Sequence, residues 1–313
     1  PLGWRCAWTS EIDPFPAAIV EHHYQLPNLG DMTTIDTERA TDEHGPIDLL
    51  VGGTPCQSFS VAGLRKGLAD PRGNLALVYL GLADRLRPRW VVWENVPGVL
   101  SSNGGRDFGA FLGALGQLGY GFAYRVLDAQ YVRVESHARA VPQRRRRVFV
   151  VGHLGDWRRA AAVLLERESL RGHPPPRREA GEGVAGALSP GAHPGGCNGQ
   201  DAHASQLIVM APAPTCNHKA PIVVNHRQHP ITSERVAMPI DNEGGGGQAL
   251  CNGVSVRRLT PRECERLQGF PDDYTLVEYR SKPAADTPRY KALGNSMAVN
   301  VMSWLGQRIK KHA

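Results

Sequence analysis

Between Trp8 and about Val151, short apolar runs alternate with stretches in which apolar residues recur every three or four positions. This alternation is the βαβ pattern of a parallel sheet covered by helices on both faces, and it constrains the fold more than any other feature. The expected strands are residues 6–9, 49–51, 90–93, 121–127 and 148–151, and the expected helices are residues 74–86 and 108–118. The sequence therefore predicts an α/β fold.

Length and composition narrow the classes of protein that fit. A chain of 313 residues is long enough for one substantial domain and a smaller one. It has no apolar stretch near the length of a membrane span, and its six cysteines lack the spacing of a metal site or a disulfide framework. The formal net charge of +6 is compatible with a polyanionic partner without proving one. We therefore expect a cytoplasmic protein with no membrane contact and no metal.

Cys56 lies in a setting suited to a catalytic nucleophile. The apolar run 47–51 ends in two glycines, and a proline-flanked turn follows, so Cys56 is expected at the carboxyl edge of the sheet, where open α/β folds bind ligands. A free cysteine is more often a buried structural residue. The flanking Pro55 and the polar Gln57 and Ser58 favour the exposed position here.

Five sequence blocks, in this order, resemble the motifs of the DNA cytosine-5 methyltransferases of bacterial or phage type. The blocks are Gly53-Thr54-Pro55-Cys56-Gln57-Ser58-Phe59, Trp93-Glu94-Asn95-Val96-Pro97, Gln143-Arg144-Arg145-Arg146-Arg147-Val148-Phe149, Arg258-Leu259-Thr260-Pro261-Arg262-Glu263-Cys264 continuing to Gln268-Gly269-Phe270-Pro271, and Tyr290-Lys291-Ala292-Leu293-Gly294-Asn295-Ser296. The resemblance runs from about residue 8 to 308, apart from about 155–254. It implies a Rossmann-like S-adenosylmethionine-dependent methyltransferase sheet with a smaller, loop-rich target-recognition domain.

The resemblance also divides the chain into three parts. Residues 1–155 would form the catalytic and cofactor-binding domain, residues 156–254 the target-recognition domain, and residues 255–313 a segment that returns to the catalytic domain. The middle part is rich in proline and glycine, with β-like runs at 206–210 and 221–224, and a disordered linker is an equally good interpretation. A helix is expected to begin after the N-cap Thr260, and another to span about 296–310.

The implied chemistry begins with a covalent bond to the base. Cytosine C5 is a poor nucleophile, so its methylation requires a thiolate that adds to C6 and activates the ring. By resemblance Cys56 supplies the thiolate. Glu94, which follows the strand-like run 90–93, would stabilise the ring near N3 by donating a proton or a hydrogen bond.

A second group of candidate catalytic residues lies in the arginine-rich block. Gln143, Arg145 and Arg147 share one face of an extended segment, and the resemblance implies that the two arginines hold the target base and a nearby phosphate. Arg144 and Arg146 would point the other way, toward solvent or backbone.

S-adenosylmethionine is the methyl donor that the resemblance implies. Glu11 is placed to accept hydrogen bonds from ribose hydroxyls at a strand end, Ile12 to pack on adenine, and Asp31 to contact the adenine. The implied cofactor contacts are Glu11, Ile12, Asp31, Met32, Gly53, Pro55, Asn295 and Ser296.

Double-stranded DNA is the implied partner. The target base is expected to flip out of the stack, because C5 and C6 cannot be attacked from both faces inside a duplex. The basic loop 64–72 resembles the mobile catalytic loop of the family. The expected DNA contacts are Gln57, Ser58, Ser60, Arg65, Lys66, Arg72, Lys219 and Arg227, with Arg177 and Arg178 as further phosphate contacts. The resemblance implies a monomer, with a cognate restriction endonuclease as a potential partner.

The family pattern breaks at the start of the chain. The Phe-x-Gly-x-Gly loop that the family places near the methionine part of the cofactor is missing, so we interpret the chain as lacking the first strand and expect weakened cofactor binding. A catalytically inactive, truncated DNA-binding remnant of the family is the alternative function. RNA methylation is a third interpretation, which the long segment before Val254 disfavours. A thiol hydrolase would need a positioned histidine, and none of the twelve histidines stands in such a setting.

Overall fold

The computed structural model describes residues 2–54, 75–166, 208–212, 222–223, 250–251 and 254–313. The chain divides into two compact units. Unit 1 comprises Pro1–Asp128, Arg146–Arg171 and Val301–Ala313. Unit 2 comprises Ala129–Arg145 and Gly172–Asn300. Each unit therefore contains segments that are far apart in the sequence.

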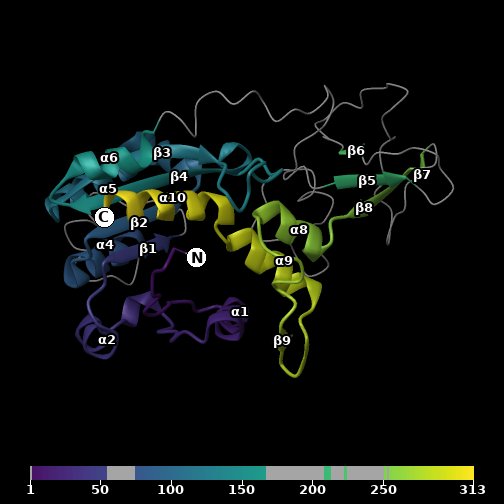
Figure 1. The fold of residues 1–313 in the computed structure, drawn as a ribbon, viewed down its shortest axis with the longest axis horizontal. Helices are drawn as coiled ribbons and strands as arrows, with labels where there is room; N and C mark the ends of the chain where they lie inside the picture. Colours follow the sequence, from purple (N-terminus) through teal and green to yellow (C-terminus); the bar gives the residue numbers. More distant parts are fainter. Residues whose placement is uncertain (1, 55–74, 167–207, 213–221, 224–249, 252–253) are drawn as a thin grey trace. The chain divides into compact units, whose positions relative to one another are not determined.

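Unit 1 is built on a four-stranded sheet with strand order β1-β2-β4-β3 (Figure 1). The strands are β1 (Leu49–Gly53), β2 (Trp90–Asn95), β3 (Tyr120–Asp128) and β4 (Arg146–Leu154). Strands β1 and β2 are parallel, whereas β4 is antiparallel to both β2 and β3. The four corresponding sequence predictions are confirmed. The sheet is mixed rather than parallel, because β3 returns into β4 without an α-helix between them.

The predicted strand at residues 6–9 is wrong. Only Thr9 forms a β-bridge, parallel to Asn28, through bonds from Thr9 N–H to the Pro27 carbonyl and from Leu29 N–H to the Thr9 carbonyl. The next bond of a parallel ladder toward the amino end would need an N–H on Pro27, which proline lacks. The pairing therefore stops after one residue.

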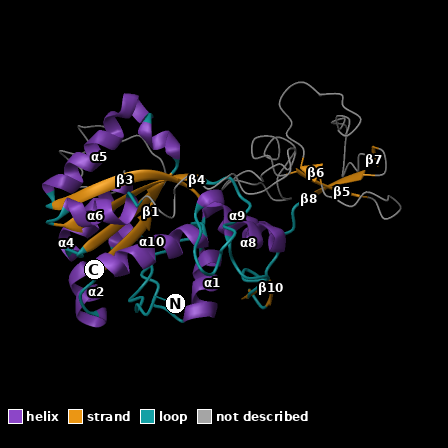
Figure 2. Ribbon diagram, turned by 45° about the horizontal axis from the view of Figure 1, so that its top comes forward, coloured by secondary structure: helices purple, strands orange, loops and turns teal. Residues whose placement is uncertain are grey.

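Helices pack on both faces of the sheet (Figure 2). On one face, α4 (Leu75–Leu86) and α5 (Arg106–Gln117) bury Tyr79, Trp93 and Phe111, which confirms the helices predicted at 74–86 and 108–118. The Tyr79 ring fits only because residue 52 is glycine, since a Cβ there would lie 2.8 Å from the ring. On the other face, α6 (Trp157–Leu164) packs against β3 and β4.

Further helices are described outside the sheet of unit 1. They are α1 (Pro14–Tyr24), α2 (Thr37–His44), α10 (Val299–His312) and the 3-10 helices η1 (Met32–Thr34), η3 (Pro97–Leu100), η4 (Ser102–Gly105) and η5 (Ala129–Tyr131). Helix α10 confirms the predicted closing helix, and Arg308 on it donates through Nε to the Val163 carbonyl of α6 at 2.6 Å. Among the described residues, no helix combines the length and apolar character needed to cross a bilayer.

Unit 2 contains a small antiparallel sheet and a helical part. The sheet has the order β6-β5-β8-β7, with β5 (Ile208–Pro212), β6 (Ile222–Val223), β7 (Leu250–Cys251) and β8 (Val254–Arg258). The helical part consists of α8 (Pro261–Gln268), the hairpin β9 (Glu278–Tyr279) and β10 (Lys282–Pro283), and α9 (Asp286–Asn295). The β-like runs predicted at 206–210 and 221–224 coincide with β5 and β6. Thr260 is the N-cap of α8, as predicted, and it forms a capping box with Glu263.

Candidate active site

The carboxyl ends of β1 and β2 lie side by side in unit 1. In this parallel pair Gly53 is the register partner of Glu94. The chain leaving β1 is held at the buried Thr54, whose hydroxyl accepts a hydrogen bond from Trp93 Nε1 at 3.0 Å. The Thr54 carbonyl accepts a second bond from Asn95 Nδ2 at 2.9 Å. These contacts hold Thr54, the last described residue of this segment, against β2.

Glu94 and Arg147 form an ion pair across the antiparallel strands β2 and β4. Arg147 Nε lies 3.1 Å from Glu94 Oε1, and each side chain is only 13% exposed. Burial lowers the pKa of Arg147, and the Glu94 carboxylate acts in the opposite direction. Because a guanidinium still keeps its proton at neutral pH, the site holds a fixed positive charge directly beside a carboxyl group.

Burial alternates along the arginine-rich block as predicted. Gln143, Arg145 and Arg147 are buried or half-buried, whereas Arg144 and Arg146 are exposed. This is the period-two pattern of an extended chain, and it separates inward-facing from solvent-facing arginines.

Within unit 2, Arg145 binds the carboxyl end of α9. Its Nη2 atom donates to the Gly294 carbonyl at 3.1 Å and to the Ser296 carbonyl at 2.7 Å. A helix ends with carbonyl groups that have no partner within the helix, so a buried guanidinium can cap them. The predicted contact of Arg145 with a base or phosphate stays a prediction, and Nη2 already has these two backbone partners.

Gln143 is the most unusual residue of the block. Its side chain is completely buried, and neither Nε2 nor Oε1 has a hydrogen-bond partner among the described residues. A buried amide without partners is costly in a folded protein. Its polar atoms are therefore suited to bind a group that the described residues do not supply.

The two segments predicted to hold the cofactor are joined in unit 1. Glu11 N–H donates to Asn28 Oδ1 and Asn28 Nδ2 donates to the Glu11 carbonyl, each at 2.9 Å. The Ser10 hydroxyl donates to the Gly30 carbonyl at 2.6 Å, next to Asp31. Together with the bridge between Thr9 and Asn28, these bonds place the Glu11 and Asp31 segments beside each other.

The side chains at this junction suit an adenosine group. Ile12 is 72% exposed and offers an apolar surface next to Glu11. Asp31 is exposed at the N-cap of η1, where the Thr33 N–H holds the pKa of its carboxyl below the usual value. An apolar surface with two carboxylates matches a flat base and ribose hydroxyls. Met32 is half-buried and packs against the core of unit 1.

The other predicted site residues are distributed as follows. In unit 2, Asn295 is exposed at the last turn of α9, and Ser296 donates through its hydroxyl to the Leu293 carbonyl at 2.8 Å. The predicted residues that lie outside the described part of the chain are Pro55, Cys56, Gln57, Ser58, Ser60, Arg65, Lys66, Arg72, Arg177, Arg178, Lys219 and Arg227.

Three supporting residues received no role from the sequence. Thr54 and Asn95 hold the strand ends beside Glu94, and Gln268 donates through Nε2 to the Leu293 carbonyl at 2.6 Å, near the end that Arg145 caps. All three lie inside the five sequence blocks. Their position in those blocks could have marked them as site residues. Their hydrogen-bond partners could not be predicted, because the partners lie far away in the sequence.

Comparison with known proteins finds methyltransferases that act on DNA bases. The family model described as C-5 cytosine-specific DNA methylase matches residues 2–190 and 197–311. The chain is 33% identical to the DNA N-6-adenine-methyltransferase of Escherichia phage P1, over 99% of this chain and 59% of that protein. It is 27% identical to the type II methyltransferase M.HpaII of Haemophilus parainfluenzae, over 98% of this chain and 84% of that protein.

The fold itself has solved counterparts. The Dnmt2 methyltransferase of S. pombe superposes with a TM-score of 0.56 at 18% identity, covering 96% of this chain and 89% of that chain. This similarity confirms the predicted α/β methyltransferase fold.

Proposed function

Because the chain belongs to the C-5 cytosine-specific DNA methylase family, we propose that it transfers a methyl group from S-adenosylmethionine to cytosine C5 in double-stranded DNA. Enzymes of this family depend on that cofactor. The observation that carries the proposal is the Glu94–Arg147 ion pair at the end of β2. Glu94 is in register with Gly53, and Cys56 follows Gly53 by three residues in the sequence, so we expect the thiol and the carboxyl group at the same edge of the sheet.

The name of the phage P1 relative raises the question of which base is methylated. The exocyclic N6 of adenine is itself a nucleophile and needs no covalent bond to the enzyme. Cytosine C5 becomes nucleophilic only after a thiolate has added to C6. The sequence has a cysteine three residues after β1, and the end of β2 carries a carboxyl group with a guanidinium partner. A thiol and a carboxyl group are needed for the cytosine reaction, whereas the adenine reaction has no use for the thiol. We therefore assign cytosine as the target base.

In the proposed mechanism, the Cys56 thiolate forms a bond to C6 while electrons of the C5–C6 double bond shift into the ring. Glu94 in its protonated form would stabilise the activated ring by donating a proton or a hydrogen bond to N3, and Arg147 would fix its orientation and add a permanent positive charge. When bound, S-adenosylmethionine would supply an electrophilic methyl group to C5, and the S–CH3 bond would break to leave the neutral thioether S-adenosylhomocysteine. Transfer of the C5 proton to solvent and release of the Cys56 thiolate from C6 would then restore the aromatic base.

Arg145 has a positioning role in this proposal. Its bonds to the Gly294 and Ser296 carbonyls order the turn that carries Asn295 and Ser296. Both residues belong to the proposed cofactor contacts, together with Glu11, Ile12, Asp31, Met32, Gly53 and Pro55. Gln143 would satisfy its buried amide with a polar group of the substrate.

We further propose that residues 156–254 recognise the DNA target and that the base is flipped out of the duplex. The proposed phosphate contacts are Arg65, Lys66, Arg72, Lys219 and Arg227. Gln57, Ser58 and Ser60, which follow Cys56 in the sequence, are the other proposed DNA contacts. The protein would act as a monomer, with or without a cognate endonuclease, in the cytoplasm of a bacterial or phage-infected cell. The relatives named above come from a bacterium and a phage.

The test is transfer of labelled methyl from S-adenosylmethionine to mixed-sequence duplex DNA, followed by nucleoside analysis. We expect 5-methyldeoxycytidine, lost in Cys56→Ser and retained in Cys6→Ser, a matched control at an exposed cysteine to which no role is assigned. DNA containing 5-fluorocytosine should trap a covalent complex, because fluorine cannot leave as a proton does. Formation of N6-methyladenine would overturn the proposal. DNA binding without any methyl transfer would support the inactive remnant instead.

A further inference from the structure

The β9–β10 hairpin of unit 2 has an unfavourable turn. Tyr279 and Lys282 are register partners, so Arg280 and Ser281 form a two-residue loop. Their φ angles are 55° and 61°, which places both residues in the left-handed region. Turns of this type strongly favour Asn-Gly, because glycine has no Cβ and asparagine tolerates a positive φ better than most residues. Strained turns of non-glycine residues persist where the surrounding structure holds them, and they often mark functional sites.

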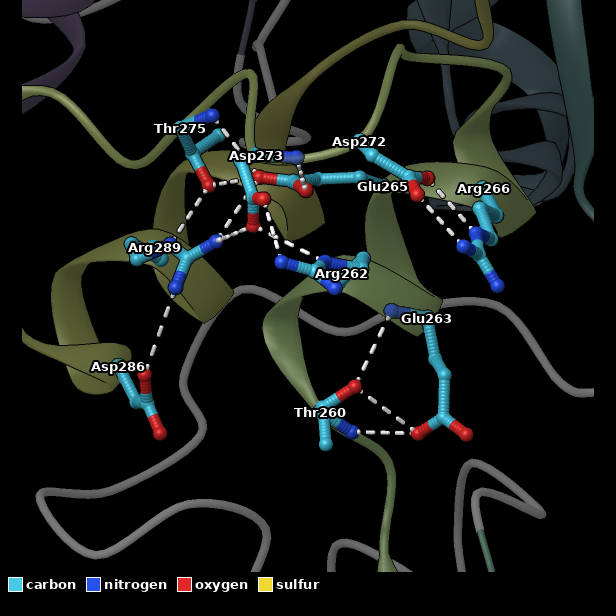
Figure 3. A network of polar contacts seen from close by, with 10 residues as sticks. All are labelled: Thr260, Arg262, Glu263, Glu265, Arg266, Asp272, Asp273, Thr275, Asp286 and Arg289. Atoms are coloured by element: carbon cyan, nitrogen blue, oxygen red, sulfur yellow. Dashed lines mark hydrogen bonds and ion pairs between the residues drawn. The ribbon is translucent and has the colours of Figure 1, made fainter.

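The base of this hairpin is firmly anchored (Figure 3). Glu265 of α8 is completely buried, and its carboxylate accepts bonds from the N–H groups of Asp273 and Thr275 at 2.7 and 2.8 Å. Arg289 of α9 donates to the same carboxylate through Nη2 at 3.2 Å. The chain that leads into the hairpin is therefore tied to both helices.

The hairpin stem is closed just above this anchor. Ala284 N–H donates to the Val277 carbonyl at 3.0 Å, and both side chains are buried. Figure 1 shows the hairpin extending away from α8 and α9. A rigid stem therefore carries the strained tip into solvent.

The tip presents cations without acidic partners. Arg280, Ser281 and Lys282 are all exposed, and within the described part of the chain neither Arg280 nor Lys282 forms an ion pair. The Arg280 guanidinium lies over the Tyr279 ring, 5.1 Å from its centroid, which restricts its orientation. Glu278 is the one carboxylate of the hairpin, and it lies opposite Pro283 in the stem, not at the tip.

The neighbouring arginines behave differently. Arg262 pairs with Asp273 and Arg266 pairs with Asp272, each through two hydrogen bonds (Figure 3). Carboxylates are therefore abundant in this part of unit 2, yet the hairpin tip lacks one. Unpaired cations on a rigid, strained tip indicate a polyanionic partner.

We propose that the β9–β10 tip binds the sugar–phosphate backbone of duplex DNA without reading its sequence. Arg280 and Lys282 would neutralise phosphates, and the Ser281 hydroxyl would donate to a phosphate oxygen. The proposal rests on the proposed function only in taking double-stranded DNA as the partner. It adds a contact site outside the arginines assigned to the catalytic loop and the target-recognition part.

The experiment measures binding of a fluorescent, mixed-sequence DNA duplex to the full chain at several salt concentrations, without cofactor. Arg280→Ala/Lys282→Ala is compared with the control Arg158→Ala/Lys311→Ala, which removes two exposed cations from unit 1. A second variant, Arg280→Asn/Ser281→Gly, removes the arginine while supplying the residues that this turn prefers, so it is expected to fold. An RNA duplex of the same length is the second ligand.

The salt slope is the slope of log affinity for DNA against log salt concentration. Each lost phosphate contact should lower its magnitude by about 0.9. We expect a decrease of about 1 to 2 for the hairpin double variant, about 1 for Arg280→Asn/Ser281→Gly, and a smaller change for the control. Equal slopes for hairpin and control variants would overturn the proposal, and so would a loss confined to RNA. A chain that binds DNA through the tip but transfers no methyl group would keep this inference and refute the proposed activity.

Discussion

Arg147 Nε lies 3.1 Å from Glu94 Oε1, and the pair joins two antiparallel strands at a place where both side chains are nearly buried. A partly buried ion pair contributes little net stability when the cost of desolvation is included. Its clear effect here is geometric, because it fixes the carboxyl group at the carboxyl end of β2. We therefore interpret the pair as a device for orientation more than for stability.

Glu94→Gln should reduce the rate of methyl transfer by about two to four orders of magnitude, the usual contribution of a positioned general acid. Duplex DNA affinity should change little, because the side chain makes no phosphate contact in the proposed mechanism. Single-turnover transfer and equilibrium binding separate the two effects. Arg147→Lys is the matched variant, since it keeps the charge but lacks the planar fork, and it should retain more activity. Full activity of Glu94→Gln would remove Glu94 from the mechanism.

Arg145→Ala should destabilise the chain by about 2 to 4 kcal/mol, because a buried guanidinium with two backbone acceptors is lost. Its neighbour Arg144 is exposed, so Arg144→Ala should stay within about 0.5 kcal/mol of the parent. Urea unfolding of both variants gives the comparison. Calorimetry should also show weaker S-adenosylmethionine binding for Arg145→Ala. If the two variants were equally stable, the capping role of Arg145 would be excluded.

The sequence predicted those parts of the fold that depend on neighbouring residues. The capping box of Thr260 and Glu263 spans four residues, and its chemistry can be read directly from their order. The strands of unit 1 were predicted from their apolar runs. The reversed direction of β4 was not predictable in this way, because a strand buried on both faces is apolar whichever way it runs.

Helix α9 shows why other parts were missed. Its stability depends on partners that are distant in the chain: Arg289 binds Glu265, and Arg145 binds the Gly294 and Ser296 carbonyls about 150 positions away. The apolar pattern of the helix is weak because one of its buried positions is this arginine. The sequence likewise placed Arg145 and Arg147 on one face, but only the structure distinguishes a capping arginine from one that is paired with Glu94.

His153 should make the stability of unit 1 sensitive to acid. Burial, followed by the charge of Arg159, lowers the pKa of its imidazole, which packs edge-on against Trp90 with ring centroids 4.6 Å apart. The unfolded chain therefore binds a proton more readily than the folded one. The free energy of unfolding should fall as the pH decreases below about 6.5, the ordinary pKa of histidine, and should be unaffected by this group at higher pH.

The measurement for His153 is urea unfolding between pH 5 and 8 for the parent and for His153→Phe, which keeps an aromatic ring against Trp90. Other groups also titrate in this range, so the informative quantity is the difference between the two curves. We expect the parent to lose more stability than the variant toward pH 5. Parallel curves would show that His153 titrates alike in the folded and unfolded chain.

Relief of the strained hairpin should stabilise the protein. A non-glycine residue in the left-handed region costs about 1 to 2 kcal/mol, and asparagine and glycine tolerate that region best. Glycine also raises the entropy of the unfolded chain, which offsets about 0.5 to 1 kcal/mol. Arg280→Asn/Ser281→Gly should therefore gain about 1 kcal/mol in unfolding free energy while it loses affinity for duplex DNA. Arg280→Ala/Lys282→Ala, which leaves a non-glycine turn, should lose affinity without the gain in stability. If Arg280→Asn/Ser281→Gly raised both the free energy of unfolding and the affinity for duplex DNA, the strain at this turn would serve no binding function.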